Sequence, residues 1–348
     1  MIYYIIYFGL GSLALLNMFE RKKHKGIFLI FTILLILLAG LRYRCGVDYY
    51  TYLRAFNGMQ SGTETLFYGQ TELIFRIIFK FSPYLWVALL LVSFIVFIIR
   101  YKTIVENTPY LLMTLFVYYS VYFLYYDMGL MRQGMAMAIA LYSIKYIKQR
   151  DLKKFLLAIA IGFLCHRAIL LFIPAYFLAE NRWNKAQMIG ITMGSFAISL
   201  LPLSQLFGWI LQFIPYGSRY VKYLDTNNFS LQNLLRLVVL LIFIFLLNEQ
   251  DEDTKRMVNI YAMGTWMYYA FMSIYYVSNR GTAFYLVTQI FLWPKMLKSV
   301  RGSFKKTIVI CMILVYTFYY FHQALYLFTE DTYANAPLMP YQITNFGE

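Results

Sequence analysis

The chain has 348 residues, of which 61% are hydrophobic and 14% are charged, whereas a soluble domain carries about 25% charged residues. This composition excludes a soluble protein and indicates a polytopic membrane protein. The net charge of +15 would suggest nucleic-acid binding in a soluble chain, but basic loops facing anionic lipid explain most of it here, so no nucleic-acid partner is expected. The three cysteines lack paired or metal-ligand spacing, which argues against a disulfide or a zinc site.

Apolar runs separated by short polar segments predict an all-α fold with about twelve transmembrane helices. We expect one transmembrane domain, 1–348, and a first helix that is retained, because a signal peptide's basic region and cleavage site are missing. The segments 155–166 and 168–180 are short enough to be broken or tilted helices. The predicted spans are 2–19, 27–41, 84–99, 109–126, 133–147, 155–166, 168–180, 187–211, 231–248, 257–277, 281–294 and 307–328.

Orientation follows from three Lys-rich segments, 21–25, 145–154 and 295–306, which fall in alternate loops and so share one side. The positive-inside rule places that side in the cytoplasm. Of the 31 Lys and Arg residues, 20 then lie inside and 11 outside, and both termini lie outside. This topology puts Arg100 in a cytoplasmic loop and Asp127 in an outer one.

Three outer segments are longer than simple connections: 42–83, 212–230 and the tail 329–348. Within the first, apolar residues alternate with Arg76 and Lys80 at helical spacing near 71–81. A helix of that length is too short to span a bilayer, so it is expected to be an interfacial amphipathic helix.

Arginine is unusually frequent on the predicted outer side, which holds nine of the fifteen arginines but only two lysines. Because Lys and Arg serve the charge rule about equally, another cause is needed. Guanidinium is a permanent, planar, bidentate ligand of phosphate and carboxylate, so the outer face is predicted to hold an anion. The outer arginines are Arg42, Arg44, Arg54, Arg76, Arg132, Arg167, Arg219, Arg236 and Arg280.

Candidate site residues lie at outer helix ends in at least five sequence-distant segments. Ionisable groups at membrane depth are expensive and tend to be functional, so converging helix ends would form a polar cavity at the outer leaflet. The alternative for the arginines is that they anchor helix ends by snorkelling. The set comprises Arg42, Arg44, Asp48, Glu72, Arg132, His166, Arg167 and Arg280.

Two members of this set have individual arguments. Arg132 opens a helix and opposes its dipole, which favours an anion shared between its side chain and the helix N-terminus. The alternative is an ion pair with Asp127. His166 is a candidate general base, because the neighbouring Arg167 would keep it neutral and able to accept a proton. The alternative is a structural histidine.

Missing motifs narrow the chemistry. The sequence has no Walker lysine motif, no Gly-x-Ser-x-Gly elbow and no Asp-x-Asp pair for a metal-bound nucleotide sugar. An enzyme of the outer leaflet has little access to ATP or nucleotide sugars, so its activated donor must come in the membrane. We therefore expect no cofactor and a metal-independent reaction.

Several short motifs follow one another along the chain: Arg42-Tyr43-x-x-Gly46-x-Asp48-Tyr49-x-x-Tyr52, Glu72, Met131-Arg132-Gln133-x-x-Ala136, His166, Arg280 and the Pro340-Tyr341 ending. In type and order they resemble EpsG-like proteins, which are counted with the Wzy-type polysaccharide polymerases.

The resemblance implies a glycosyltransferase of the bacterial inner membrane, similar in fold to C-type glycosyltransferases. It would polymerise undecaprenyl-pyrophosphate-linked oligosaccharide repeats at the extracytoplasmic face, alongside a flippase and a chain-length regulator. Arginines would stabilise the leaving pyrophosphate and a base would activate the acceptor hydroxyl. The expected pyrophosphate ligands are Arg42, Arg44, Arg132, Arg167 and Arg280; the expected base is His166 or Asp48; Glu72, Tyr49 and Tyr341 complete the site.

Three other functions stay open. A polysaccharide ligase would use the same donor with a different acceptor. A flippase or transporter would need a cavity open to either face in turn, whereas the ionisable residues gather on one side. A membrane O-acyltransferase would need a catalytic histidine on an acyl-carrier route, which an outer His166 does not match. The sugar and the linkage cannot be read from the sequence.

Overall fold

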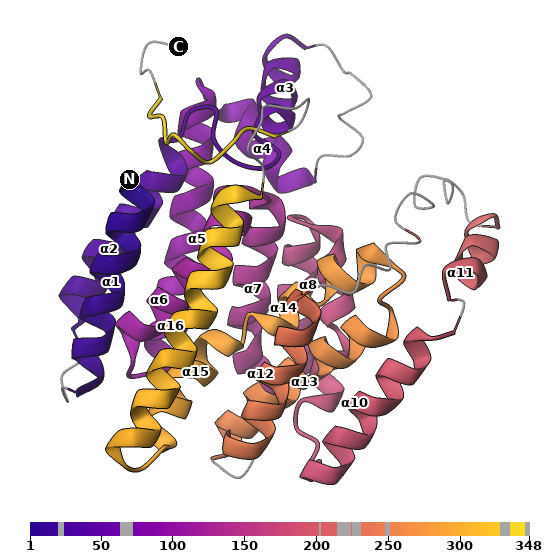
Figure 1. Ribbon diagram of the computed structural model, residues 1–348. Coiled ribbons are helices and arrows are strands. Elements are labelled where there is room, and N and C mark those ends of the chain that lie inside the picture. The colour runs from indigo at the N-terminus through magenta and orange to yellow at the C-terminus, as the bar shows by residue number, and fades with distance from the viewer. Residues whose placement is uncertain are drawn as a thin grey trace. The chain divides into compact units, whose positions relative to one another are not determined.

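The described chain is built almost entirely of helices in a computed structural model (Figure 1). The description covers residues 1–19, 24–62, 72–201, 203–213, 224, 231–247, 251–327 and 335–344. Parts of the predicted outer segments 42–83, 212–230 and 329–348 lie outside these residues, as does the basic cluster at 21–23. So do Arg219, Lys222, Glu64, Asp225, Glu330, Asp331 and Glu348.

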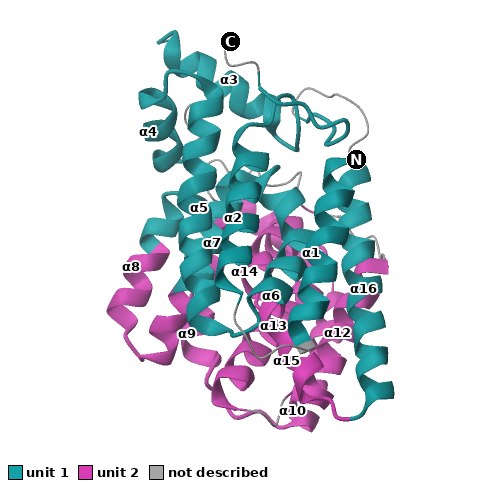
Figure 2. Ribbon diagram, turned by 90° about the vertical axis from the view of Figure 1, so that its left-hand side faces the viewer, with its two compact units in different colours: residues 1–142, 160–167, 302–348 teal, residues 143–159, 168–301 magenta. Residues whose placement is uncertain are grey.

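Contacts divide the chain into two compact units (Figure 2). Unit 1 holds Met1–Tyr142, Ala160–Arg167 and Gly302–Glu348; unit 2 holds Ser143–Ile159 and Ala168–Arg301. The single transmembrane domain stays a prediction. Unit 1 contains α1 (Ile2–Phe19), α2 (Lys25–Gly40), α3 (Tyr49–Gln60), α4 (Leu73–Phe81), α5 (Leu85–Asn107), α6 (Leu111–Tyr118), the π-helix η2 (Tyr119–Asp127), most of α7 (Met131–Lys148) and α16 (Ser303–Tyr326).

Unit 2 is built around α13, which packs against α10, α12, α14 and α15. Its polar contacts join helices far apart in sequence, as when Trp266 Nε1 donates to Thr192 Oγ1 over 2.8 Å. It contains most of α8 (Leu152–Phe163) and of the 3₁₀ turn η3 (Arg167–Phe172), then α9 (Pro174–Leu178), α10 (Lys185–Ser199), α11 (Leu203–Leu211), α12 (Leu231–Leu247), α13 (Glu252–Ala270), the π-helix η5 (Tyr276–Gly281), α14 (Ala283–Leu286) and α15 (Gln289–Ser299).

Two described helices, α5 and α16, are long and apolar enough to cross a membrane, and the bent pair α10 and α11 makes a third if it counts as one span. Shorter apolar helices include α2 and α12. These helices and the all-α architecture support a helical membrane protein. The total of about twelve spans stays a prediction.

Several predicted segments differ from the observed ones. The segment 42–83 contains a helix that was not expected, α3, in addition to the amphipathic α4. The predicted helix 109–126 changes to π geometry at Tyr119, and the predicted helix 187–211 bends by 65° between α10 and α11. The predicted helix 281–294 is divided between η5, α14 and α15. Continuous hydropathy does not detect such breaks, because they keep the side chains apolar.

Packing in unit 1 sets the position of α7. Helix α2 lies along α5, α1 lies along α6, and α16 lies along η2. Buried tyrosines fasten these contacts: Tyr119 donates to the Tyr3 carbonyl over 2.8 Å, and the hydroxyls of Tyr7 and Thr317 lie 3.0 Å apart. η2 then leads through a tight turn into the N-terminus of α7.

Candidate functional site

The loop 41–48 carries the first predicted motif, and it is paired with the C-terminal tail. Arg42 forms an antiparallel bridge with Ile343, and Gly46 forms another with Ala336. The Thr344 N–H donates to the Leu41 carbonyl over 2.8 Å. Segments almost three hundred residues apart in sequence are therefore joined by two isolated antiparallel bridges.

Gly46 explains why the motif needs a glycine. Its φ is +106°, and a Cβ at this position would lie 2.1 Å from the Met128 carbonyl oxygen. Only glycine combines that backbone conformation with so close an approach. The loop 41–48 consequently packs directly on the turn that precedes α7.

Arg42 is buried inside this packing, at 1% exposure. Its Nε donates to the Cys45 carbonyl over 3.0 Å, its Nη1 donates to the Ala39 carbonyl, and its Nη2 lies 2.8 Å from the Met131 sulfur. These contacts tie the end of α2 to the loop and to the first residue of α7. Through these contacts Arg42 positions the end of α2, the loop and the start of α7 relative to one another. Its predicted contact with pyrophosphate stays a prediction.

Tyr341 and Tyr49 are also packed within the protein. The Tyr341 hydroxyl donates to the Leu38 carbonyl over 3.1 Å, and burial raises the pKa of Tyr341 to about 12. Tyr49, buried at the start of α3, makes edge-to-face contacts with Tyr43 and Tyr50. Both residues support the loop and the tail.

Arg132 is the centre of a charged cluster at the N-terminus of α7. Its Nη1 lies 2.9 Å from Glu72 Oε2, and the side chains of Arg132 and Glu72 are 23% and 9% exposed. The guanidinium also lies 5.9 Å from the centroid of the buried Tyr52 ring, and the Asp48 carboxylate is within electrostatic range. Burial disfavours the charge of Arg132, but Tyr52, Glu72 and Asp48 outweigh it and raise the pKa of Arg132.

Asp48 has an unusual backbone conformation, with φ at +63°, immediately before α3. Its N–H donates to the Asn335 side-chain oxygen over 3.2 Å, so the tail holds this turn too. The carboxylate makes no capping bond to the helix that it precedes. It is half-buried.

His166 follows the end of α8, in a segment that is joined to α4. The Ile74 N–H of α4 donates to the Leu164 carbonyl over 3.2 Å, which joins the two helix ends. The Glu72 carboxylate is within electrostatic range of Cys165, the neighbour of His166 in sequence. His166 itself is half-exposed, and its predicted role as a base stays a prediction.

The remaining predicted arginines are placed differently. Arg44 and Arg167 are exposed, and the Arg44 guanidinium lies 5.1 Å from the centroid of the Tyr43 ring. Arg280 lies in η5 of unit 2 and is half-buried. Its predicted share in one common anion site therefore stays a prediction.

Arg100 corrects the predicted topology. It does not lie in a cytoplasmic loop but inside α5, 2% exposed, with Nη1 2.5 Å from Asp127 Oδ2. The Tyr118 hydroxyl donates to the same oxygen over 2.5 Å, and Arg100 Nη2 donates to the Gly134 carbonyl over 2.9 Å. The alternative that Arg132 pairs with Asp127 is therefore wrong, since Asp127 forms its ion pair with Arg100 and Arg132 forms its ion pair with Glu72.

Taken together, Arg42 and Arg100 hold the first turn of α7 from two directions, through Met131 and through the Gly134 carbonyl. Arg132 lies between these two contacts in sequence and projects to Glu72. The cluster thus offers one fixed, partly exposed cation and two carboxylates. In the part of the chain that the structure describes, no three His, Cys, Asp or Glu residues gather as a metal site.

Three contributors to this arrangement are not predicted from the sequence. Tyr52 belongs to the motif without a predicted role, and Asn335 carries no signal. Arg100 ends the apolar run 85–99 and comes just before Lys102, so composition alone does not distinguish it from a loop arginine.

The sequence model of the EpsG family matches residues 25–343, and the chain therefore belongs to the EpsG family. No curated protein and no solved structure matches the chain. Membership of this family, together with the apolar helices, supports a membrane protein of polysaccharide biosynthesis with a repeat-unit polymerase-like function.

Proposed function

We propose that this EpsG-family protein polymerises oligosaccharide repeats carried on undecaprenyl pyrophosphate, at the outer leaflet of the bacterial inner membrane. The growing chain is transferred from its lipid pyrophosphate to a hydroxyl of the next lipid-linked repeat. The observation that carries the proposal is the charged cluster of Arg132, Glu72 and Asp48, held at the end of α7 by two buried arginines.

In this proposal Arg132 contacts the leaving pyrophosphate. A cation fixed in place before the reaction stabilises developing negative charge without reorganising. Glu72 orients the guanidinium while leaving part of it exposed. The exposed Arg44 and Arg167 supply further contacts to the pyrophosphate, and Arg42 fixes the position of α7.

The acceptor hydroxyl needs a base, and two residues are suited to it. His166 is half-exposed, and histidine is the side chain that most often acts as a general base. Asp48 is the second candidate, since its carboxylate is not used as a helix cap. Displacement at the anomeric carbon with lipid pyrophosphate as the leaving group needs no metal ion in this proposal.

Gene deletion followed by gel analysis of surface polysaccharide tests the proposal. A polymerase deletion leaves a product with a single repeat, whereas loss of a ligase leaves long chains on the lipid carrier. Loss of a flippase leaves unpolymerised repeats on the cytoplasmic side. Unchanged chain length in the deletion strain would refute the proposed polymerase.

A further inference from the structure

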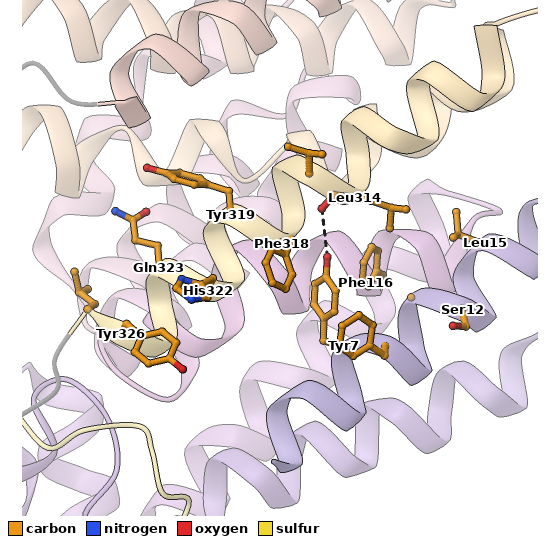
Figure 3. A pocket seen from close by; sticks show the side chains of 14 residues that line it. Tyr7, Ser12, Leu15, Phe116, Leu314, Phe318, Tyr319, His322, Gln323 and Tyr326 are labelled. Carbon is orange, nitrogen blue, oxygen red and sulfur yellow. Dashed lines mark hydrogen bonds between the residues drawn. The ribbon is translucent and has the colours of Figure 1, made fainter. Parts of the chain in front are cut away.

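An apolar groove runs along α1 and α16 of unit 1, on a face that the charged cluster does not use. Its volume is about 1100 Å³, and Phe116 of α6 lies at its floor between the two helices (Figure 3). Gly11 lets the Phe116 ring pack against the backbone of α1, since a Cβ there would lie only 2.9 Å from the ring, and the neighbouring Ser12 is small. The groove is therefore built by the sequence of α1.

The walls of the groove are exposed although they are strongly apolar. Phe8 is 59%, Val315 71% and Phe318 41% exposed. In contrast, the polar atom of the floor is satisfied, since the Tyr7 hydroxyl bonds with Thr317 and with the Leu314 carbonyl. Because α16 is long and apolar enough to span a membrane, this exposed apolar surface suits contact with an apolar chain.

Four polar side chains gather at one end of the groove, and the small Ser12 lies toward the other end. The four are Tyr319, His322, Gln323 and Tyr326, whereas Leu15 and Leu314 lie toward the end with Ser12 (Figure 3). From Leu314 to Leu327 the lining follows α16 for about 20 Å at 1.5 Å per residue. Such a surface matches an amphiphile with one long chain and a polar head.

The polar end belongs to the same end of unit 1 as the charged cluster. The C-terminus of α16 and the N-terminus of α1 point toward α3 and α4 (Figure 1). Near this end, the Tyr3 hydroxyl of α1 donates to the Leu338 carbonyl over 3.0 Å, and its ring lies 5.9 Å from the Tyr341 ring. The same tail is bridged to the loop 41–48.

We propose that this groove binds the polyprenyl chain of a lipid-linked substrate, with the head of the lipid directed to the charged cluster. The inference rests on the proposed function for the identity of the carrier. A single groove accommodates the one chain of a polyprenyl carrier, whereas a phospholipid brings two chains. Aromatic walls and a satisfied floor stabilise the chain by apolar contact alone.

Photolabelling of the purified full chain in phospholipid nanodiscs tests the site without turnover. The probe is undecaprenyl pyrophosphate with a diazirine in its prenyl chain, followed by mapping of the labelled peptides. Labels are expected on residues 7–15 and 314–327, and excess unlabelled undecaprenyl pyrophosphate should remove them. Labels that fall elsewhere would overturn the proposal.

Matched substitutions test whether the labelling depends on the space inside the groove. Ser12→Trp and Val315→Trp place an indole in the groove at exposed positions and should lower labelling on the order of tenfold. Ile5→Trp is the control, since Ile5 is 65% exposed on the same helix but does not line the groove. Equal labelling in all three variants would contradict the site.

A second probe separates this site from ordinary lipid contact. If a diazirine phosphatidylglycerol labels the groove equally and undecaprenyl pyrophosphate does not displace it, the groove holds bulk lipid and the proposal fails. Labelling that behaves as expected in a protein that forms no polymer would contradict the proposed polymerase while supporting the prenyl site.

Discussion

Arg132 Nη1 lies 2.9 Å from Glu72 Oε2, across sixty residues of sequence, and the pair stays partly open to its surroundings. Glu72 leads into α4 and Arg132 begins α7, so the pair fixes two helix ends relative to each other. It also leaves a guanidinium that keeps its charge and can face a second anion. The account of the site depends on this relationship.

Replacing Arg132 by Lys keeps the charge but removes the planar fork. We expect polymer formation to fall by roughly 10²-fold, the order seen when a preorganised donor to a developing oxyanion is lost. The measurement is polymer synthesis at equal protein level. Arg76→Lys is the control, because Arg76 is an exposed arginine of α4 in the same unit, and it should leave synthesis unchanged.

Glu72→Gln tests whether Glu72 acts through Arg132. If it does, the double variant with Arg132→Lys should lose no more activity than Arg132→Lys alone, because residues in one network are not additive. Rates for the two single variants and the double variant complete the cycle. Strictly multiplicative losses would mean that the two side chains work independently.

Gly46→Ala should destabilise the protein through the loop 41–48. The alanine would adopt an unfavourable φ, which costs about 1–3 kcal/mol, and its Cβ would also meet the Met128 carbonyl. Gly62→Ala is a matched control, because Gly62 also has positive φ, at +68°, but nothing lies within 4 Å of its Cβ position. Thermal unfolding in detergent should show the larger loss for Gly46→Ala; equal losses would contradict the packing described.

Asp127→Asn should be strongly destabilising, because it leaves the buried Arg100 without its counter-charge. Breaking a buried pair typically costs about 3–5 kcal/mol, against about 0–1 kcal/mol for an exposed one. Lys148→Gln, which breaks the exposed pair with Asp253, is the comparison. Should Asp127→Asn unfold at the wild-type temperature, the pair would not be what holds α7.

Much of the fold could be predicted from hydropathy, but the site could be predicted only in part. The amphipathic helix near 71–81 and the apolar spans α5 and α16 follow from the sequence, since periodicity and length are local properties. The partners of Arg42 could not be found in the same way, because they come from the end of α2 and from Met131, which is distant in sequence. Position at a helix end identified the charged residues but not which of them are buried.

Arg132 and Arg42 illustrate the difference. Both were predicted to bind an anion, yet Arg42 is 1% exposed and its donors contact the protein, while Arg132 stays partly accessible. The distinction depends on the tail, which covers the loop 41–48 through pairings such as that of Arg42 with Ile343. Non-local pairing of this kind leaves no pattern in a single sequence.

His166→Ala and Asp48→Asn distinguish the two candidate bases. A general base contributes about 10²–10⁴-fold, so the variant that lacks it should nearly stop turnover while still binding lipid-linked substrate. In-vitro rate and substrate binding are measured for both variants. If His166→Ala retains more than about a third of the wild-type rate, His166 is not the base. If Asp48→Asn is then inactive, Asp48 is the base.

The most direct test is reconstitution of the purified protein with one undecaprenyl-pyrophosphate-linked repeat, in the presence of a chelator. The account predicts a ladder of products that grows by whole repeats, with one lipid pyrophosphate released for each bond formed. Failure to form any ladder, with or without added magnesium or manganese, would contradict the polymerase; a ladder that appears only with the metal would contradict the metal-independent mechanism.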